Sequence, residues 1–156
     1  MFHDGEYFMR SWRRSLLLGI ALFLLPVAAL AEGELRAVSP DGSQKVFPGL
    51  RVVNAASAVY FVDNAAHQML IVVKTACSKK GELQVCTGTG VAWDRYGVRT
   101  DLDASSVMLY YNGTEKSVGI ENSPYTLTPN TLKLDIVTVK GTHISGVGFV
   151  DSTSLP

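Results

Sequence analysis

The sequence predicts a mainly β fold, either an antiparallel β-sandwich or a small barrel, with at most one short helix. Short runs rich in β-branched and aromatic residues recur at close spacing, and Gly, Asn and Pro turn signals separate them. Two cysteines stand at a spacing that suits a hairpin. The chain has no internal repeat and no low-complexity tract, and its pattern does not separate a sandwich from a barrel.

The first 31 residues have the features of a secretory signal peptide. Three arginines within 10–14 precede an apolar run over 16–25, and Ala29 and Ala31 supply the small residues ahead of a cleavage site. The apolar run is shorter than the roughly 20 residues that a membrane span needs. We therefore expect cleavage, with no stable membrane insertion afterwards.

Cleavage after Ala31 leaves residues 32–156 as a single exported β domain, long enough to bury its own core. Met9 is an alternative start, because acidic residues are unusual ahead of a basic leader. The predicted location is periplasmic or secreted, and the compact leader favours a bacterial envelope. The chain has 14 Lys and Arg against 14 Asp and Glu and no basic run, which argues against nucleic acid as a partner.

The first part of the exported domain has a weak pattern. Residues 32–49 are polar and rich in turn formers, so we expect an irregular segment with at most one short strand, turning at 39–42. Residues 50–62 fit either a short helix or a strand. Residues 69–75 are dense in β-branched side chains and predict a buried strand, and residues 83–93 predict the strand that follows it.

Cys77 and Cys86 predict a disulfide across a hairpin. Gly81 and Glu82 lie midway between them, and Gly at the first central position favours a two-residue type II′ turn. That turn places the two cysteines opposite each other, at a non-hydrogen-bonded pair within disulfide reach. An exported compartment permits the bond, so the pair is interpreted as a structural staple.

Two further hairpins are expected towards the C-terminus. Asn112-Gly113 is the preferred pair for a type I′ turn, which would place Leu109 opposite Lys116. The second hairpin, over 132–150, is expected to turn at Lys140-Gly141. In that register Leu132 pairs with Phe149, Leu134 with Val147, and Ile136 with Ser145. It puts Gly146 and Gly148 on the polar face, where another backbone or a ligand can approach closely.

Few residues suggest catalysis, and we expect no enzyme, no cofactor and no metal site. The exported domain has two histidines, His67 and His143, and both are expected at turns. The chain contains no G-x-S-x-G, H-E-x-x-H or P-loop motif. The glycine-containing run 87–90 lacks the lysine of a phosphate loop, and the run from Asp101 lacks the Gly and Glu that an EF-hand requires.

The best candidate for a binding surface is a cluster of aromatic and charged residues at the end of a strand. It consists of Trp93, Asp94, Arg95, Tyr96 and Arg99. Trp, Tyr and Arg are the residues most enriched among the hot spots of protein interfaces. The structural alternative is a core Trp93 beside an ordinary ion pair between Asp94 and Arg95.

These observations favour an exported, non-catalytic module that binds or inhibits a protein partner through the 93–99 loop. The first alternative is a structural or accessory subunit of a bacterial envelope assembly, which would join by strand addition at an unpaired edge such as the strand of Gly146 and Gly148. The least favoured hypothesis is a small hydrolase built around His67 or His143.

Overall fold

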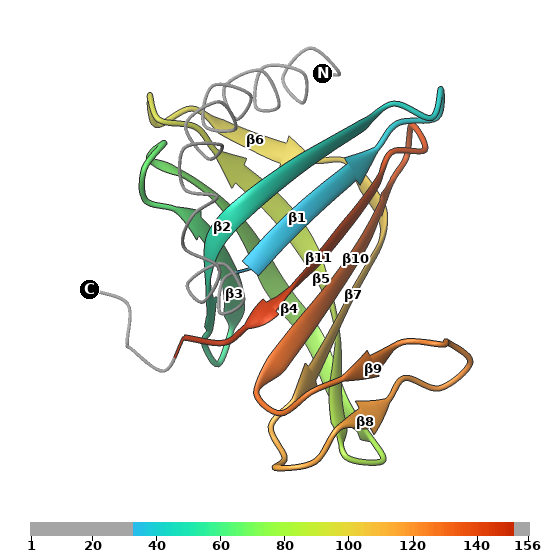
Figure 1. Ribbon diagram of the computed structural model, residues 1–156. Helices are drawn as coiled ribbons and strands as arrows, with labels where there is room; N and C mark the ends of the chain where they lie inside the picture. The colour runs from blue at the N-terminus through green and yellow to red at the C-terminus, as the bar shows by residue number, and fades with distance from the viewer. Residues whose placement is uncertain (1–32, 152–156) are drawn as a thin grey trace, which may run out of the picture.

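Eight antiparallel strands form a closed barrel, which settles the choice between a sandwich and a barrel (Figure 1). The computed structural model describes residues 33–151, so the predicted signal peptide lies outside the described residues. Within that range the secondary structure is strand and turn, without the short helix allowed for over 50–62. Residues 33–151 include no helix long and apolar enough to cross a membrane.

The strands are β1 (Gly33–Val38), β2 (Gln44–Asn54), β3 (Ala58–Asp63), β4 (Gln68–Lys80), β5 (Leu83–Trp93), β6 (Arg99–Leu102), β7 (Ala104–Asn112), β8 (Val118–Gly119), β9 (Thr126–Leu127), β10 (Thr131–Thr138) and β11 (His143–Phe149). Barrel neighbours follow the order β4-β3-β2-β1-β11-β10-β7-β5, and β4 pairs with β5 to close the ring. β6 pairs with the far end of β5, while β8 and β9 form a separate two-stranded ribbon.

The polar segment after the leader is more regular than its composition suggests. β1 and the start of β2 occupy it, so the expectation of an irregular segment is wrong. The turn at 39–42 is confirmed: Gly42 donates its N–H to the carbonyl of Ser39 and has a φ of 87°. Leu35 and Phe47 face the core while their polar neighbours face water. The alternation of apolar and polar residues that is typical of a strand is therefore present, but the turn residues between the two strands obscure it in the sequence.

The barrel interior is packed with side chains. Alternate residues of every barrel strand point inward and are buried in one apolar cluster. Its largest fully buried members are Phe61, Leu35, Leu50, Leu70, Leu109, Leu132, Leu134 and Ile136. A second, smaller cluster of Leu83, Val85, Ile120 and Leu127 joins the β8–β9 ribbon to the outer face of the barrel.

The β10–β11 hairpin differs from the expected register by one residue. Leu134 pairs with Gly146 and Ile136 with Ile144. The turn contains a third residue: Gly141, with φ of 91°, donates to the carbonyl of Thr138, and Thr138 donates to that of Thr142. A one-residue shift moves every side chain of a strand to the other face. The prediction that the two glycines lie on the polar face is therefore wrong.

Gly146 and Gly148 instead point into the barrel, where only glycine fits. A Cβ on Gly146 would lie 2.6 Å from Cδ2 of Leu35. A Cβ on Gly148 would lie 2.5 Å from the Cα of Gly33 on β1. The expected close approach of another backbone is thus present, but it faces inward and lets β1 and β11 pack tightly.

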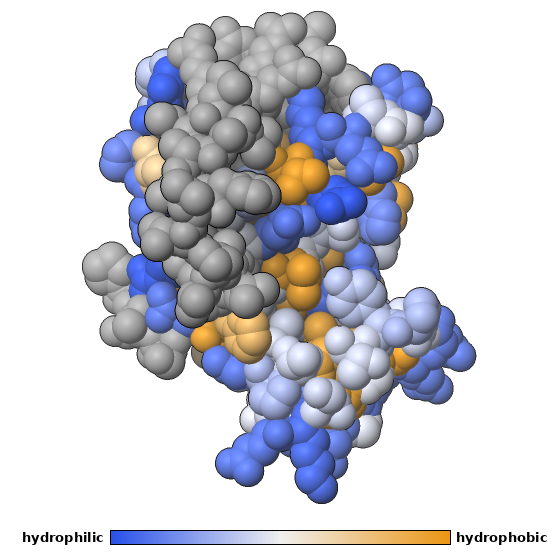
Figure 2. Space-filling view, in the orientation of Figure 1, coloured by the Kyte–Doolittle hydropathy of each residue, from blue (hydrophilic) through white to orange (hydrophobic). Residues whose placement is uncertain are grey.

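The expected hairpin at Asn112-Gly113 is absent. β7 ends at Asn112 and pairs with β5 and β10, so Leu109 lies opposite Cys86 and Leu134 and not opposite Lys116. The Asn112 side chain is fully buried and donates to the carbonyls of Lys116, Leu127 and Thr128. Its Oδ1 accepts hydrogen bonds from Thr114. Asn112 therefore anchors the segment that carries β8 and β9 as a lobe on the barrel end, and the tip of this projecting lobe is mainly hydrophilic (Figure 2).

The stapled hairpin is confirmed in full. Cys77 and Cys86 lie opposite each other, form a disulfide and have Cα atoms 4.1 Å apart. Lys80 pairs with Leu83 around the turn, and Gly81 has a φ of 61°, as a type II′ turn requires. The β4 half of this hairpin, from Thr75 to Lys80, is exposed, so the staple holds an arm that gains little from core packing.

Replacing both cysteines with serine is expected to lower the free energy of unfolding by about 2.5–3 kcal/mol, because the bond closes a short loop in the unfolded chain. Chemical denaturation of the double variant Cys77→Ser/Cys86→Ser measures this change. Reduced wild-type protein is the matched control and should show the same loss. A reduced protein with an unchanged midpoint would show that the staple does not stabilise the fold.

Candidate functional site

The residues of the predicted binding cluster lie where β5 ends and turns into β6. Trp93 is the last residue of β5 and lies opposite Arg99, the first residue of β6. Asp94, Arg95 and Tyr96 lie in the tight turn that joins these two strands. The structure therefore gathers all five predicted residues within one β5–β6 hairpin, which we call the 93–99 loop.

Asp94 holds this loop in one conformation. Its Oδ1 accepts hydrogen bonds from the backbone N–H groups of Tyr96, at 2.8 Å, and Val98, at 2.9 Å. Its own N–H donates to the carbonyl of Val98, and Gly97, with φ of 76°, donates to the carbonyl of Asp94. These bonds fix the backbone of the loop, and a preorganised loop loses less conformational entropy if it forms a contact.

The clamped turn presents an aromatic ring to solvent. Tyr96 is 70 % exposed and the neighbouring Val98 is 55 % exposed. The guanidinium of Arg95 lies 4.8 Å from the centre of the Tyr96 ring and donates to its hydroxyl. A rigid aromatic residue with an adjacent cation is a combination typical of interface hot spots.

The other members of the cluster have separate contacts. Trp93 is partly buried and is not a core residue, and Asp94 pairs with backbone groups, so the structural alternative for these residues is wrong. Arg99 forms an exposed ion pair with Asp101 on the same strand, at 3.0 Å. Exposed pairs of this kind contribute little to stability, so Arg99 can exchange this contact for one with a partner.

A second surface, which the sequence did not reveal, lies on the outer face of the barrel. Glu34 and Arg36 of β1 form one wall, Lys133 and Asp135 of β10 form the other, and Ser145 and Val147 of β11 form the floor. Tyr125, from the loop between β8 and β9, and His143 complete the lining. We call this groove, with a volume of about 320 Å³, the outer trough.

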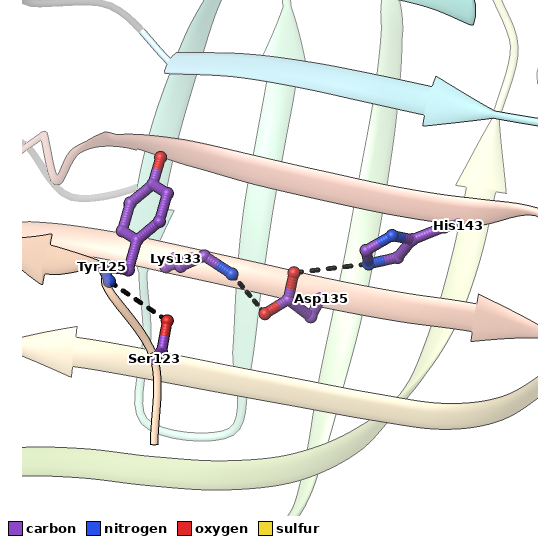
Figure 3. A network of polar contacts seen from close by, with 5 residues as sticks. All are labelled: Ser123, Tyr125, Lys133, Asp135 and His143. Carbon is purple, nitrogen blue, oxygen red and sulfur yellow. Dashed lines mark hydrogen bonds and ion pairs between the residues drawn. The ribbon is translucent and has the colours of Figure 1, made fainter. Parts of the chain in front are cut away.

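Charged side chains in the outer trough contact one another, and Figure 3 shows the contacts among Lys133, Asp135 and His143. Lys133 forms an ion pair with Asp135, and Nε2 of His143 lies 3.5 Å from the other oxygen of that carboxylate. On the opposite wall Arg36 pairs with Glu34 at 3.3 Å. Lys133 is also covered by the Tyr125 ring, whose centre lies 5.0 Å from Nζ.

The two histidines occupy different settings. His67 is exposed in the β3–β4 turn with a φ of 54°, as expected of a turn residue. His143 begins β11 and lies beside a carboxylate and near Ser145, a set that superficially resembles a hydrolase triad. In the described residues, however, no hydrogen bond joins Ser145 to His143, which nucleophile activation requires, and Asp135 is already paired with Lys133.

The remaining motifs have structural roles. The glycine-containing run 87–90 is part of β5, where a Cβ on Gly88 would lie 2.4 Å from the carbonyl of Val73 on the neighbouring strand. The run that begins at Asp101 continues from β6 into β7. Across residues 33–151, no group of three or more His, Cys, Asp or Glu side chains is placed to hold a metal ion.

The strand of Gly146 and Gly148 offers no free edge for strand addition. β11 pairs with β10 on one side and with β1 on the other. β1 in turn pairs with β2 from Gly33 onward. The unpaired edge expected at this strand is therefore absent from the described part of the chain.

The sequence singled out the 93–99 loop as a candidate surface but did not single out the outer trough. Its residues come from β1, β10, β11 and the 120–125 turn, and only the correct barrel order brings them together. One local signal was available: Glu34 and Arg36, like Lys133 and Asp135, are two residues apart and therefore lie on the same solvent-exposed face of their strand. Compared with known proteins, the chain matches no family model, no curated protein and no solved structure.

Proposed function

We propose that this protein is an exported, non-catalytic module that binds a protein partner, and that the 93–99 loop is its contact surface. The observation that carries the proposal is the clamped turn that presents Tyr96. The close-packed barrel interior supports it, because a filled barrel acts as a rigid scaffold and recognition then falls to the outer surface. The disulfide is compatible with an oxidising compartment outside the cytoplasm.

Insertion of the loop into a concave site on the partner fits its shape and chemistry. Tyr96 and Val98 supply apolar area, and Arg95 and Arg99 supply charge at the margin. Buried aromatic anchors surrounded by polar groups carry most of the energy in such interfaces. An inhibitor that blocks the active site of an enzyme or toxin is the most concrete form of this function.

Replacing both Arg95 and Tyr96 with Ala is expected to weaken binding of the partner by about 30-fold or more, the effect of losing a hot spot. The partner is captured from periplasmic extract with the wild-type protein, identified, and then titrated against each variant. Val139→Ala is the matched control, because Val139 is an equally exposed apolar residue in the turn between β10 and β11. That control should bind like the wild type.

Asp94→Ala separates preorganisation from contact. It removes the two hydrogen bonds that clamp the loop while leaving Tyr96 in place. We expect weaker binding caused mainly by slower association or a larger entropy loss. Unchanged affinity for the Arg95→Ala/Tyr96→Ala variant would show that the loop is not the contact surface.

A further inference from the structure

We propose that the outer trough binds a neutral oligosaccharide, with Tyr125 as the ring on which a sugar stacks. This site is separate from the 93–99 loop, because the trough lies on β1, β10 and β11 whereas the loop joins β5 to β6. The proposal therefore does not depend on the protein partner.

The charges of the trough favour a ligand without net charge. Each wall carries one cation and one carboxylate two residues apart, and the two form an ion pair along the strand. The order of signs is opposite on the two walls: Glu34 lies in line with Lys133, and Arg36 lies in line with Asp135. Because every cation has a carboxylate beside it, a phosphate or carboxylate ligand gains little attraction and meets repulsion.

The same side chains suit a ligand with many hydroxyl groups. The carboxylates of Glu34 and Asp135 accept hydrogen bonds, the N–H groups of Arg36 and Lys133 donate them, and the hydroxyl of Ser145 does both. Adjacent hydroxyls of a sugar ring each donate and accept, so alternating donors and acceptors along a wall match them. Bonds to charged groups are roughly twice as strong as neutral ones, which compensates for a shallow site.

The dimensions of the trough fit one or two sugar rings. Its walls stand on β1 and β10 with β11 between them, so they are two strand spacings apart, about 9.6 Å. The floor is low because Ser145 and Val147 are small. A volume of about 320 Å³ is at the lower end of the range for ligand pockets, about 300–1,000 Å³.

Tyr125 supplies the stacking platform at one end. The backbone of its turn is fixed by three hydrogen bonds. Ile120 donates to the carbonyl of Tyr125, and Ser123 donates to the carbonyl of Ile120. The N–H of Tyr125 donates to the Ser123 hydroxyl, as Figure 3 shows. Lys133 lies against the ring, yet 41 % of the Tyr125 surface remains exposed. The negative face of an aromatic ring attracts the C–H bonds of a sugar ring.

The test is a titration of the 156-residue chain with three neutral trisaccharides: cellotriose, maltotriose and triacetylchitotriose. Amide chemical shifts are followed by NMR up to about 10 mM sugar, which detects millimolar affinity. We expect at least one sugar to shift the amides of Tyr125, Asp135 and Ser145. Tyr125→Ala and Asp135→Asn should each weaken that sugar about tenfold, whereas Tyr96→Ala, an exposed tyrosine outside the trough, should leave it unchanged.

Three results would overturn the proposal. The first is no shift with any of the three sugars, and the second is shifts confined to residues outside the trough. The third comes from trigalacturonic acid, an anionic sugar of similar size, which should bind more weakly than the neutral ones. Tighter binding of this anion would show that the trough selects charge, contrary to the paired side chains.

Discussion

Replacing Phe61 with Ala is expected to lower the free energy of unfolding by about 3–5 kcal/mol. Phe61 lies on β3 and is fully buried. A Cβ placed on Gly146 of β11 would lie 3.1 Å from two atoms of the Phe61 ring, although β2 and β1 separate these strands in the barrel. The ring therefore reaches across the interior, and its removal leaves a cavity that the rigid barrel cannot close.

Phe149→Ala is the matched control for this prediction. Phe149 is also a phenylalanine and is the last residue of β11, but it is 43 % exposed. Its replacement should cost well under about 1 kcal/mol, as for most surface changes. Equal, small losses for the two variants, measured by chemical denaturation, would show that the interior is loosely packed. The barrel would then be better interpreted as a container for an apolar ligand than as a scaffold.

Local signals predicted the parts of the fold in which the turn type alone decides the pairing. The stapled hairpin follows its expected register because Gly81-Glu82 is a two-residue turn and the disulfide excludes other pairings. The register of the β10–β11 hairpin differs from the expected one because Val139, Lys140 and Gly141 form a three-residue turn. A single Gly after Lys fits both a two-residue and a three-residue turn, so the sequence did not decide between them. One extra turn residue was enough to invert the faces of β11.

The error at Asn112-Gly113 has a different physical cause. The pair is a strong local signal for a hairpin, but the buried amide of Asn112 has partners up to 16 residues away, on both sides of the ribbon. Those tertiary hydrogen bonds, and the pairing of β7 with β5 and β10, outweigh the preference of the turn. These tertiary contacts also explain why the sequence did not point to the outer trough, because Tyr125 reaches the trough only through the lobe that Asn112 anchors.

The two surfaces differ in how far sequence could reveal them. The 93–99 loop is contiguous, so composition pointed to it directly, and the structure added the role of Asp94 as a clamp. The outer trough is assembled from three strands and a distant turn, and its chemistry depends on which charges lie opposite one another. Both surfaces lie on the same barrel but on different strands, so a variant in one can leave the geometry of the other unchanged.

The second large effect is expected from Asn112→Ala, which should lower the free energy of unfolding by about 3–4 kcal/mol. The change removes three hydrogen bonds to carbonyls and two from Thr114, in a fully buried position. Each such bond contributes about 0.5–1.5 kcal/mol, and carbonyls left without a partner add a further penalty. Asn64→Ala, at an exposed position in the β3–β4 turn, is the matched control and should have little effect.

Asn112 also connects the fold to the proposed sugar site, which makes its variant a test of both. Hydrogen exchange should rise most in the lobe of residues 113–130, because that segment loses its anchor while the barrel strands keep their partners. Trisaccharide binding should weaken, since Tyr125 is presented by the lobe, whereas partner binding through the 93–99 loop should persist. Uniform loss of protection across the barrel would show instead that Asn112 supports the whole fold and that the lobe has no separate stability.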